Sequence, residues 1–242
     1  MIEAFNLEKN FSGITAVNKV SLKINEGDIV GFLGPNGAGK STTMRLLSGF
    51  LSLDGGSAKI CGYDVAKDRL KAQSCIGYLP EAANGFPHLT AKEFLTYCIE
   101  CRGSSNQKVS NAINHVVDLV GLKTALNKKM LSLSKGWRQR IWLAQALIHD
   151  PPVLILDEPT DGLDPNQKDH IRHLIKSIAK NKTIILSTHI LEEAEQICNR
   201  GIVLVQGKVV SDKLITDLTD DQGRISSVFR KLTDIKNSYL AE

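Results

Sequence analysis

The 242-residue chain has little excess charge of either sign, because 30 lysines and arginines against 26 acidic residues leave a net charge of +4. A nucleic-acid-binding protein usually concentrates basic residues on one face, so we expect no nucleic-acid partner. The chain also has no uncharged apolar run long enough to cross a bilayer, and its first ten residues lack the apolar core of a signal peptide. We therefore expect a cytoplasmic chain that only a partner holds at a membrane.

Cysteine is sparse, with five residues at widely spread positions. An odd number of separated cysteines suits free thiols in a reducing compartment. Cys98 and Cys101 form a C-x-x-C pair, but no second pair with metal-ligand spacing accompanies it. We therefore expect buried or half-buried thiols there rather than zinc or redox chemistry. Internal repeats and low-complexity linkers are absent as well.

Hydrophobic periodicity predicts where the strands and helices of the chain lie. The patterns predict strands at 2–8, 16–24, 28–34, 55–63, 76–79, 152–157, 183–188 and 201–207, and helices at 89–99, 109–122, 165–180 and 190–198. Strands that are nearly all apolar and alternate with helices predict an α/β fold with a mostly parallel sheet covered on both faces. Residues 1–81 and 134–213 would form the core, 82–133 an inserted helical subdomain and 214–242 a short polar tail.

A glycine-rich loop follows the predicted strand at 28–34 and precedes a helix that starts near Lys40. The stretch GPNGAGKST at 34–42 contains G-x-x-x-x-G-K-S in the context that a phosphate loop requires. Its glycines let backbone N–H groups face phosphates, Lys40 adds a cation, and the Ser41 hydroxyl suits Mg²⁺. The loop predicts binding of a nucleoside triphosphate.

Two carboxylates, Asp157 and Glu158, end the apolar strand VLILDE at 153–158. In a phosphate-loop protein the first carboxylate orients Mg²⁺ and its water, and the second is placed to take a proton from an attacking water. His189 follows the next apolar strand and would reach the same sheet edge. A buried histidine without a ligand is the alternative for His189, and we expect His115, His149, His170 and His173 to be core or surface residues.

The stretch LSLSKGWRQRIWLAQAL at 131–147 begins with serines and a glycine and continues as an amphipathic helix. Ser134 suits the N-cap of that helix. The free N–H groups of a helix start, here beside Lys135, Arg138 and Arg140, also suit an anion. The segment by itself leaves both interpretations open.

Five motifs, taken in order, resemble the ATP-binding cassette (ABC) family over residues 1–213. They are GPNGAGKST (Walker A), GYLPE (Q-loop), LSKGW (signature), LILDEPTDGLD (Walker B and D-loop) and LSTHI (H-loop). The resemblance implies a RecA-like phosphate-loop NTPase fold with an N-terminal antiparallel β subdomain. GYLPE, LSKGWRQR and the tail ISSVFRKLT are most similar to cassettes of ABC-2-type exporters, including gliding-motility and multidrug-type systems.

The resemblance also implies site residues and partners. Two cassettes would face each other head to tail, so that Ser134 and Gly136 clasp the ATP bound by the partner and Asp164 reports to it. Glu158 would be the general base, His189 would touch the γ-phosphate, and Ser41, Asp157 and Glu81 would hold Mg²⁺. The nucleotide-binding residues would be Phe11 under the adenine and Gly34, Pro35, Asn36, Gly37, Ala38, Gly39, Lys40, Ser41 and Thr42.

This chain departs from the family pattern at three motifs. Lys135 and Trp137 stand in the signature where Gly and Gln are usual, and Glu81 stands in the Q-loop where Gln is usual. The D-loop reads Asp161-Gly162-Leu163-Asp164 instead of Ser-Ala-Leu-Asp.

The resemblance predicts an ATP-hydrolysing subunit that drives a separate membrane permease, gripped by residues near 81–103, in export from the inner face of the cell membrane. The alternative is a soluble cassette ATPase that serves as an assembly scaffold, as in iron–sulfur cluster biogenesis.

Overall fold

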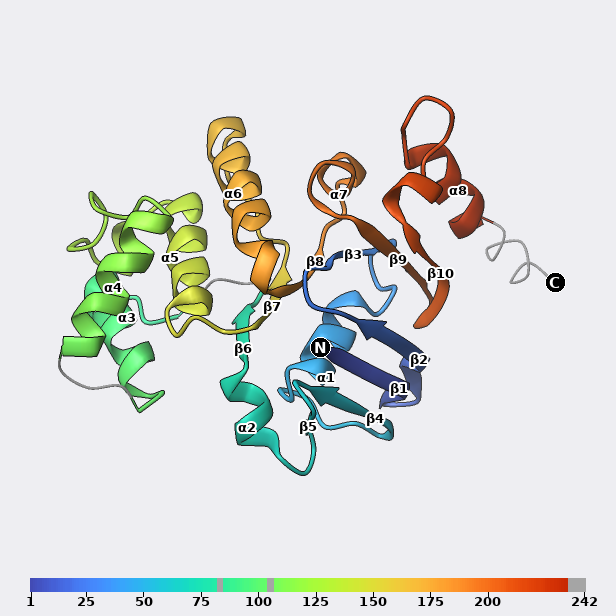
Figure 1. The fold of residues 1–242 in the computed structure, drawn as a ribbon, viewed down its shortest axis with the longest axis horizontal. Coiled ribbons are helices and arrows are strands. Elements are labelled where there is room, and N and C mark those ends of the chain that lie inside the picture. The colour runs from blue at the N-terminus through green and yellow to red at the C-terminus, as the bar shows by residue number, and fades with distance from the viewer. Residues whose placement is uncertain (82–84, 104–106, 235–242) are drawn as a thin grey trace.

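A computed structural model describes residues 1–81, 85–103 and 107–234, which form two β-sheets flanked by helices (Figure 1). The antiparallel sheet has the order β2-β1-β4-β5. The larger sheet has the order β10-β9-β3-β8-β7-β6, and only β10 runs antiparallel to its neighbour. The predicted fold class, a mostly parallel sheet with an antiparallel β subdomain, is confirmed. The strands are β1 (Ile2–Phe11), β2 (Ile14–Ile24), β3 (Ile29–Leu33), β4 (Gly55–Ile60), β5 (Tyr63–Asp64), β6 (Ile76–Leu79), β7 (Val153–Asp157), β8 (Thr183–Ser187), β9 (Arg200–Val205) and β10 (Lys208–Leu214).

The larger sheet separates two hydrophobic cores because successive side chains of a strand point to opposite faces. In β7, Val153 and Ile155 belong to one core, whereas Leu154 and Leu156 belong to the other. Helix α1 (Lys40–Leu47) and the antiparallel sheet fill the first core. Helices α5 (Lys135–Leu147), α6 (Pro165–Ile178) and α7 (Leu191–Ile197) fill the second core. Both faces of the sheet are thus covered, as the apolar strands predict.

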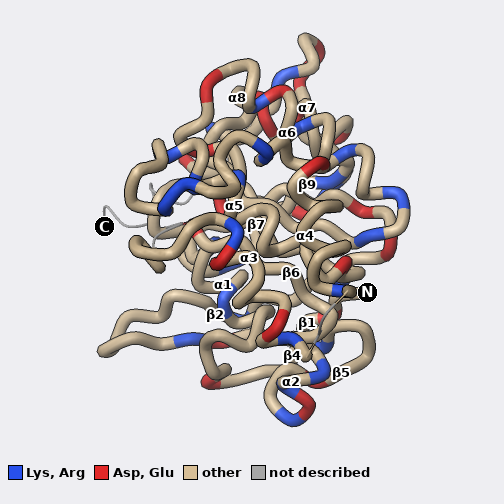
Figure 2. The backbone as a smooth tube through the Cα atoms, turned by 90° about the vertical axis from the view of Figure 1, so that its left-hand side faces the viewer, with Lys and Arg blue, Asp and Glu red and all other residues tan. Residues whose placement is uncertain are grey.

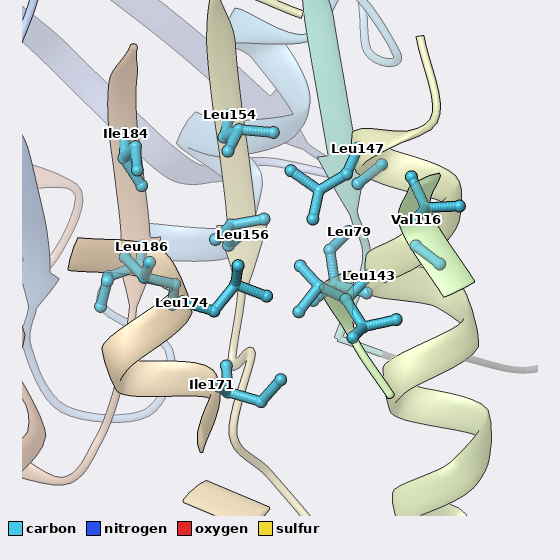
Figure 3. Packing of buried hydrophobic residues seen from close by; sticks show 14 of the residues in the cluster. Leu79, Val116, Leu143, Leu147, Leu154, Leu156, Ile171, Leu174, Ile184 and Leu186 are labelled. Carbon is cyan, nitrogen blue, oxygen red and sulfur yellow. The ribbon is translucent and has the colours of Figure 1, made fainter. Parts of the chain in front are cut away.

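Helix α6 shows how the local sequence places an element on the sheet. Asp164 caps its first turn by accepting a hydrogen bond from the Gln167 N–H at 2.9 Å, and Pro165 occupies the first position. Ile171 and Leu174 lie on the buried side of the helix and point toward β7 and β8 (Figure 3). A local cap and a buried apolar side thus place the helix predicted at 165–180 on the sheet.

Helices α3 (Ala91–Glu100) and α4 (Gln107–Leu119) pack against each other and against α5. Thr90 and Glu93 form a reciprocal capping box that begins α3, and Phe94 and Val116 are buried inside this group. The two helices predicted within 82–133 are therefore present. Residues 82–84 and 104–106 of that range lie outside the described residues.

The sequence analysis did not predict several elements, among them α2 (Arg69–Ser74), β10 and α8 (Ser226–Asp234). The expectation of a merely polar tail after residue 214 was wrong, because Leu218 and Ile225 are buried and Phe229 packs against the second core. Isolated apolar residues in a polar stretch give no periodic pattern. Such residues stabilise the fold only through tertiary contacts. The last part of the tail, 235–242, lies outside the described residues.

Charged residues of both signs alternate along the backbone on the face drawn in Figure 2. Elsewhere in the structure charged residues form ion pairs, among them the bidentate contact of Arg200 in β9 with Asp212 in β10 at 2.6 and 2.7 Å. None of the helices within the described ranges combines the length and apolar character that crossing a membrane requires.

Candidate functional site

The loop between β3 and α1 is closed by its own lysine. Lys40 begins α1, is only 8% exposed, and its Nζ donates to the carbonyl oxygens of Gly34 at 2.8 Å and Pro35 at 3.1 Å. Gly39 has a φ of 97°, and a Cβ there would lie 2.4 Å from the Ala16 carbonyl oxygen, so only glycine fits. Burial lowers the pKa of Lys40, while the nearby carboxylates of Glu158 and Asp157 oppose this shift.

Asp157 ends β7 directly opposite Ser187 at the end of β8. Its Oδ1 accepts hydrogen bonds from the Ser187 hydroxyl at 2.5 Å and from the Ser41 hydroxyl at 3.2 Å. Its Oδ2 is buried and has no hydrogen-bond partner among the residues that the structure describes. A buried carboxylate oxygen without a donor beside a serine hydroxyl is a donor set that fits Mg²⁺.

No group of three or more His, Cys, Asp or Glu side chains within the described ranges is arranged to hold a metal ion by itself. Mg²⁺ is usually held by one or two carboxylates together with substrate phosphates and waters, and Asp157 and Ser41 offer such oxygen ligands. The residues present thus fit a Mg²⁺ ion that arrives with a nucleotide.

Glu158 lies next to Asp157 and has a left-handed backbone with a φ of 51°. Its N–H donates to the Ser187 hydroxyl at 3.0 Å, and its Oε2 lies 3.0 Å from His189 Nδ1. Burial raises the pKa of Glu158, the negative charge of Asp157 adds to this, and the contact with His189 opposes it. A raised pKa suits a group that must take up a proton during a reaction.

The sequence analysis missed a buried acid, Glu193 in α7, that lies behind these residues. Its side chain is 2% exposed and accepts hydrogen bonds from the hydroxyls of Thr160 at 2.6 Å and Thr188 at 3.1 Å. Lys168 and Arg172 of α6 approach its Oε1 at 3.1 and 3.5 Å. Burial alone would raise the pKa of Glu193, but the bonds from Thr160 and Lys168 outweigh it and leave the pKa lowered. An acid on the apolar face of the helix predicted at 190–198 could have revealed this residue.

A second missed residue, Gln139, connects α5 to the carboxylates. Its side chain is buried, and its Nε2 donates to the Glu158 carbonyl oxygen at 2.9 Å. Sequence reasoning counted the apolar residues of α5 and passed over a polar residue on the same buried side.

Ser134 is the N-cap of α5 and accepts a hydrogen bond from the Trp137 N–H at 3.4 Å. Ser134 is exposed, whereas Gly136 is buried against α6, where a Cβ would lie 2.8 Å from Gln167 Oε1. Because α5 and α1 cover opposite faces of the larger sheet, this helix start and the phosphate loop are held by different cores. Figure 1 shows the two helices on either side of β6 and β7.

The remaining predicted site residues lie toward the surface. Phe11 ends β1, is 43% exposed, and has the Lys9 ammonium 5.6 Å from its ring centre. Glu81 is exposed beyond β6, and its charge tends to raise the pKa of Lys40, as expected for a nearby carboxylate. Within the loop, Pro35, Asn36 and Gly37 are exposed, Gly39 and Thr42 are half-buried, and Gly34, Ala38 and Lys40 are buried.

A cleft of about 750 Å³ lies apart from these residues, lined by parts of α2, β6 and α3. Cys98 and Cys101 line it together with Phe50 and Tyr97. Cys98 is half-buried, and burial raises its pKa to about 12, which suits an unreactive thiol. Cys101 is exposed, so the expectation of a buried or half-buried thiol was wrong there.

The other histidines are outside the site, as expected. His115, His170 and His173 are exposed. His149 is half-buried in the wall of the cleft, and burial lowers its pKa to about 4.

A phosphate loop between β3 and α1, with Asp157 and Glu158 at the end of a parallel strand, defines a phosphate-loop nucleoside triphosphatase. Residues 17–161 match the ABC transporter family. The chain belongs to this family and is an ATP-binding subunit with an ABC-type ATPase domain.

Two curated relatives illustrate the similarity. The chain is 39% identical over 225 residues to the uncharacterized ABC transporter ATP-binding protein YhcH of Bacillus subtilis (strain 168), covering 92% of this chain and 72% of the relative. It is 36% identical over 225 residues to the Nod factor export ATP-binding protein I of Rhizobium etli, covering 91% of this chain and 70% of the relative.

Solved structures agree with the sequence relatives. The ATP-binding subunit of an ABC transporter superposes with a TM-score of 0.87 at 27% identity, covering 96% of this chain and 99% of that one. A dimeric ATP-binding cassette in a post-hydrolysis state with ADP and Pi gives a TM-score of 0.82 at 28% identity, covering 88% and 98%.

Proposed function

We propose that this ATPase works as a head-to-tail pair of cassettes that couples ATP binding and hydrolysis to export by a separate membrane permease. The observation that carries this proposal is the separation of the phosphate loop and the start of α5 onto opposite faces of one sheet. An exposed, capped helix start is a suitable anion site, and a second copy can bring it to the phosphates. The dimeric structural relative with ADP and Pi supports this arrangement.

Within one cassette, Lys40 and the amides of the loop hold the phosphates, and Phe11 stacks under the adenine. Ser41 and Asp157 hold Mg²⁺, with Glu81 as a further oxygen ligand; when bound, the ion would neutralise phosphate charge. Glu158 takes the proton of the attacking water, and His189 contacts the γ-phosphate. The unpartnered Oδ2 of Asp157 and the contact between Glu158 and His189 support these roles.

Across the dimer, Ser134 and the Gly136 N–H bind the γ-phosphate of the nucleotide held by the partner cassette, and Asp164 carries the D-loop contact. The charge-assisted bond from an N–H group or hydroxyl to a phosphate is stronger than a bond between neutral groups. Hydrolysis therefore requires both copies, and a second copy of this chain is the partner we propose.

The permease docks in the cleft between α2, β6 and α3. Its rim carries exposed apolar side chains, with Phe50 67%, Leu70 82% and Tyr97 50% exposed, beside Arg102. An exposed group of apolar side chains with a charged residue beside it is typical of a protein-binding site. The relative named for Nod factor export supports the direction of transport, and the permease would hold the chain at the inner face of the cell membrane.

Affinity purification from detergent-solubilised membranes of the native cell, followed by mass spectrometry, tests this function. We expect a polytopic membrane protein in stoichiometric amount, and substituting Tyr97 and Leu70 together by Asp should release it while ATPase activity persists. Recovery only from the soluble fraction with soluble partners would contradict the transporter role and support the assembly-scaffold alternative.

A further inference from the structure

Three of the residues that depart from the usual family pattern contact one another, although they come from separate motifs. Lys135 is the first residue of α5, and Asp161 and Gly162 lie in the loop between β7 and α6. The Lys135 ammonium lies 2.5 Å from Asp161 Oδ2. The Asp161 N–H in turn donates to the Glu158 carbonyl oxygen at 3.1 Å. The signature and D-loop departures therefore meet at a single ion pair.

Gly162 completes this contact sterically. Its φ is +74°, a conformation that suits glycine. A Cβ at this position would lie 2.5 Å from Lys135 Cδ and 2.8 Å from both its Cγ and Cε. The aliphatic stem of Lys135 thus runs directly over Gly162, and an alanine in the same place would force the lysine side chain to move away. The lysine in one motif and the glycine in the other fit each other.

We propose that Lys135, Asp161 and Gly162 form a positioning unit that fixes the D-loop to the start of α5. Ser134 directly precedes Lys135, and Asp164 ends the loop that holds Asp161 and Gly162. The unit sets the distance between these two residues before a partner cassette is met. This inference rests on the proposed head-to-tail dimer, in which both residues act across the interface.

The exposure of the pair determines where its effect is measurable. The side chains of Lys135 and Asp161 are 59% and 38% exposed, so in the monomer water screens the pair and it adds little to folding stability. A partner surface that excludes water strengthens the same attraction. The pair should therefore influence dimer formation and turnover while thermal unfolding of the monomer stays unchanged.

A double-mutant cycle tests the ion pair. Analytical ultracentrifugation measures ATP-dependent dimerisation of K135A, D161A and the double variant, each combined with E158Q. ATP turnover is measured separately for the same variants with Glu158 intact. We expect each single change to weaken the dimer by about 3- to 10-fold and the double change to add nothing further. The swapped variant K135D/D161K should recover dimerisation. Additive single effects, or a swap that recovers nothing, would overturn the proposal.

A second double-mutant cycle tests the steric contact between Lys135 and Gly162. G162A alone should weaken dimerisation, and the added loss should be smaller in the K135A background, where the contact with the lysine stem is gone and only the strain of a left-handed alanine remains. Equal added losses from G162A with and without Lys135 would contradict the contact. The exposed pair Lys123–Asp118, at 2.8 Å, is the matched control, and K123A and D118A should leave dimerisation unchanged.

The two proposals fail differently. If the E158Q parent does not dimerise with ATP, the head-to-tail dimer fails and this inference fails with it. If the parent dimerises but the cycles are additive, only the positioning unit fails.

Discussion

At the scale of single residues, Glu158 combines a strained backbone with a destabilised charge. A non-glycine residue with a left-handed φ costs about 1–3 kcal/mol and persists only where its surroundings fix it. Here the Ser187 hydroxyl accepts from its N–H, and the Gln139 amide donates to its carbonyl oxygen. The backbone is held from both sides, so the carboxyl group is aimed before any substrate arrives.

Replacing Glu158 by Gln should keep ATP binding and slow hydrolysis by about 10²- to 10⁴-fold, as expected when a general base is lost. Nucleotide titration and steady-state phosphate release measure the two effects. The raised pKa means that the charged form is less favourable in the folded state than in the unfolded chain, so E158Q should not lower the thermal midpoint at pH 8. Unchanged turnover would remove Glu158 from this role.

Replacing His189 by Ala should move the acid limb of the ATPase pH profile to higher pH. The His189 ring favours the charged form of Glu158, so its removal raises the pKa of Glu158 further and the base becomes protonated at a higher pH. The midpoint of log kcat against pH measures the shift, independently of any loss in maximal rate. H173A, at an exposed histidine of α6, is the control, and a limb that stays in place in H189A would contradict the coupling.

At the scale of secondary-structure elements, Glu193 joins three segments that carry site residues. Thr160 lies between Glu158 and the D-loop, Thr188 precedes His189, and Lys168 belongs to α6. One buried carboxylate thus fixes the ends of β7 and β8 relative to α6. A buried hydrogen-bonded network of this kind holds its members rigidly, and removing its central carboxylate leaves several groups without partners.

Replacing Glu193 by Gln should lower the free energy of unfolding by about 1–3 kcal/mol near pH 7, because Lys168 and Arg172 lose their counter-charge. The lowered pKa makes this stabilisation fully present above about pH 4.5, the ordinary value, and it is lost as the pH falls through the lower folded value. Urea unfolding at several pH values measures it. E192Q, at the exposed neighbour, is the control, and a difference that does not shrink as the pH falls below about 4.5 would contradict this assignment.

At the scale of the whole molecule, the larger sheet keeps the two halves of the proposed ATP site of one chain apart. The phosphate loop and α5 are anchored in separate cores. The described monomer therefore contains both halves of the proposed site but does not bring them together. In a symmetric dimer each copy supplies the half that the other lacks.

Replacing Ser134 by Ala should impair hydrolysis and leave nucleotide binding by the monomer intact, because its hydroxyl acts on the partner's nucleotide. Mixing S134A with K40A, each impaired alone, should raise activity above that of either variant, since a mixed dimer has one site with both an intact loop and an intact signature. Phosphate release by the mixture against each variant alone measures this. Loss of ATP binding by monomeric S134A, or no recovery on mixing, would contradict action across the dimer.

The sequence by itself determined the features that rest on local chemistry. The G-x-x-x-x-G-K-S loop, the apolar strand before Asp157 and the suitability of Ser134 as a helix cap depend on neighbouring residues, so local spacing indicates them. Alternating apolar strands and helices likewise determined the α/β class, because strand burial follows from composition.

Only the tertiary structure decided the contacts between distant segments. Glu193 lies 33 positions from Thr160, and Lys135 lies 26 from Asp161; nothing local to either pair indicates the contact. The tertiary structure also decided the strand order and the packing of the tail on the second core. Single apolar residues of the tail, such as Leu218 and Ile225, give no periodicity. Such contacts depend on which faces the completed sheet brings together, and that is a property of the whole fold.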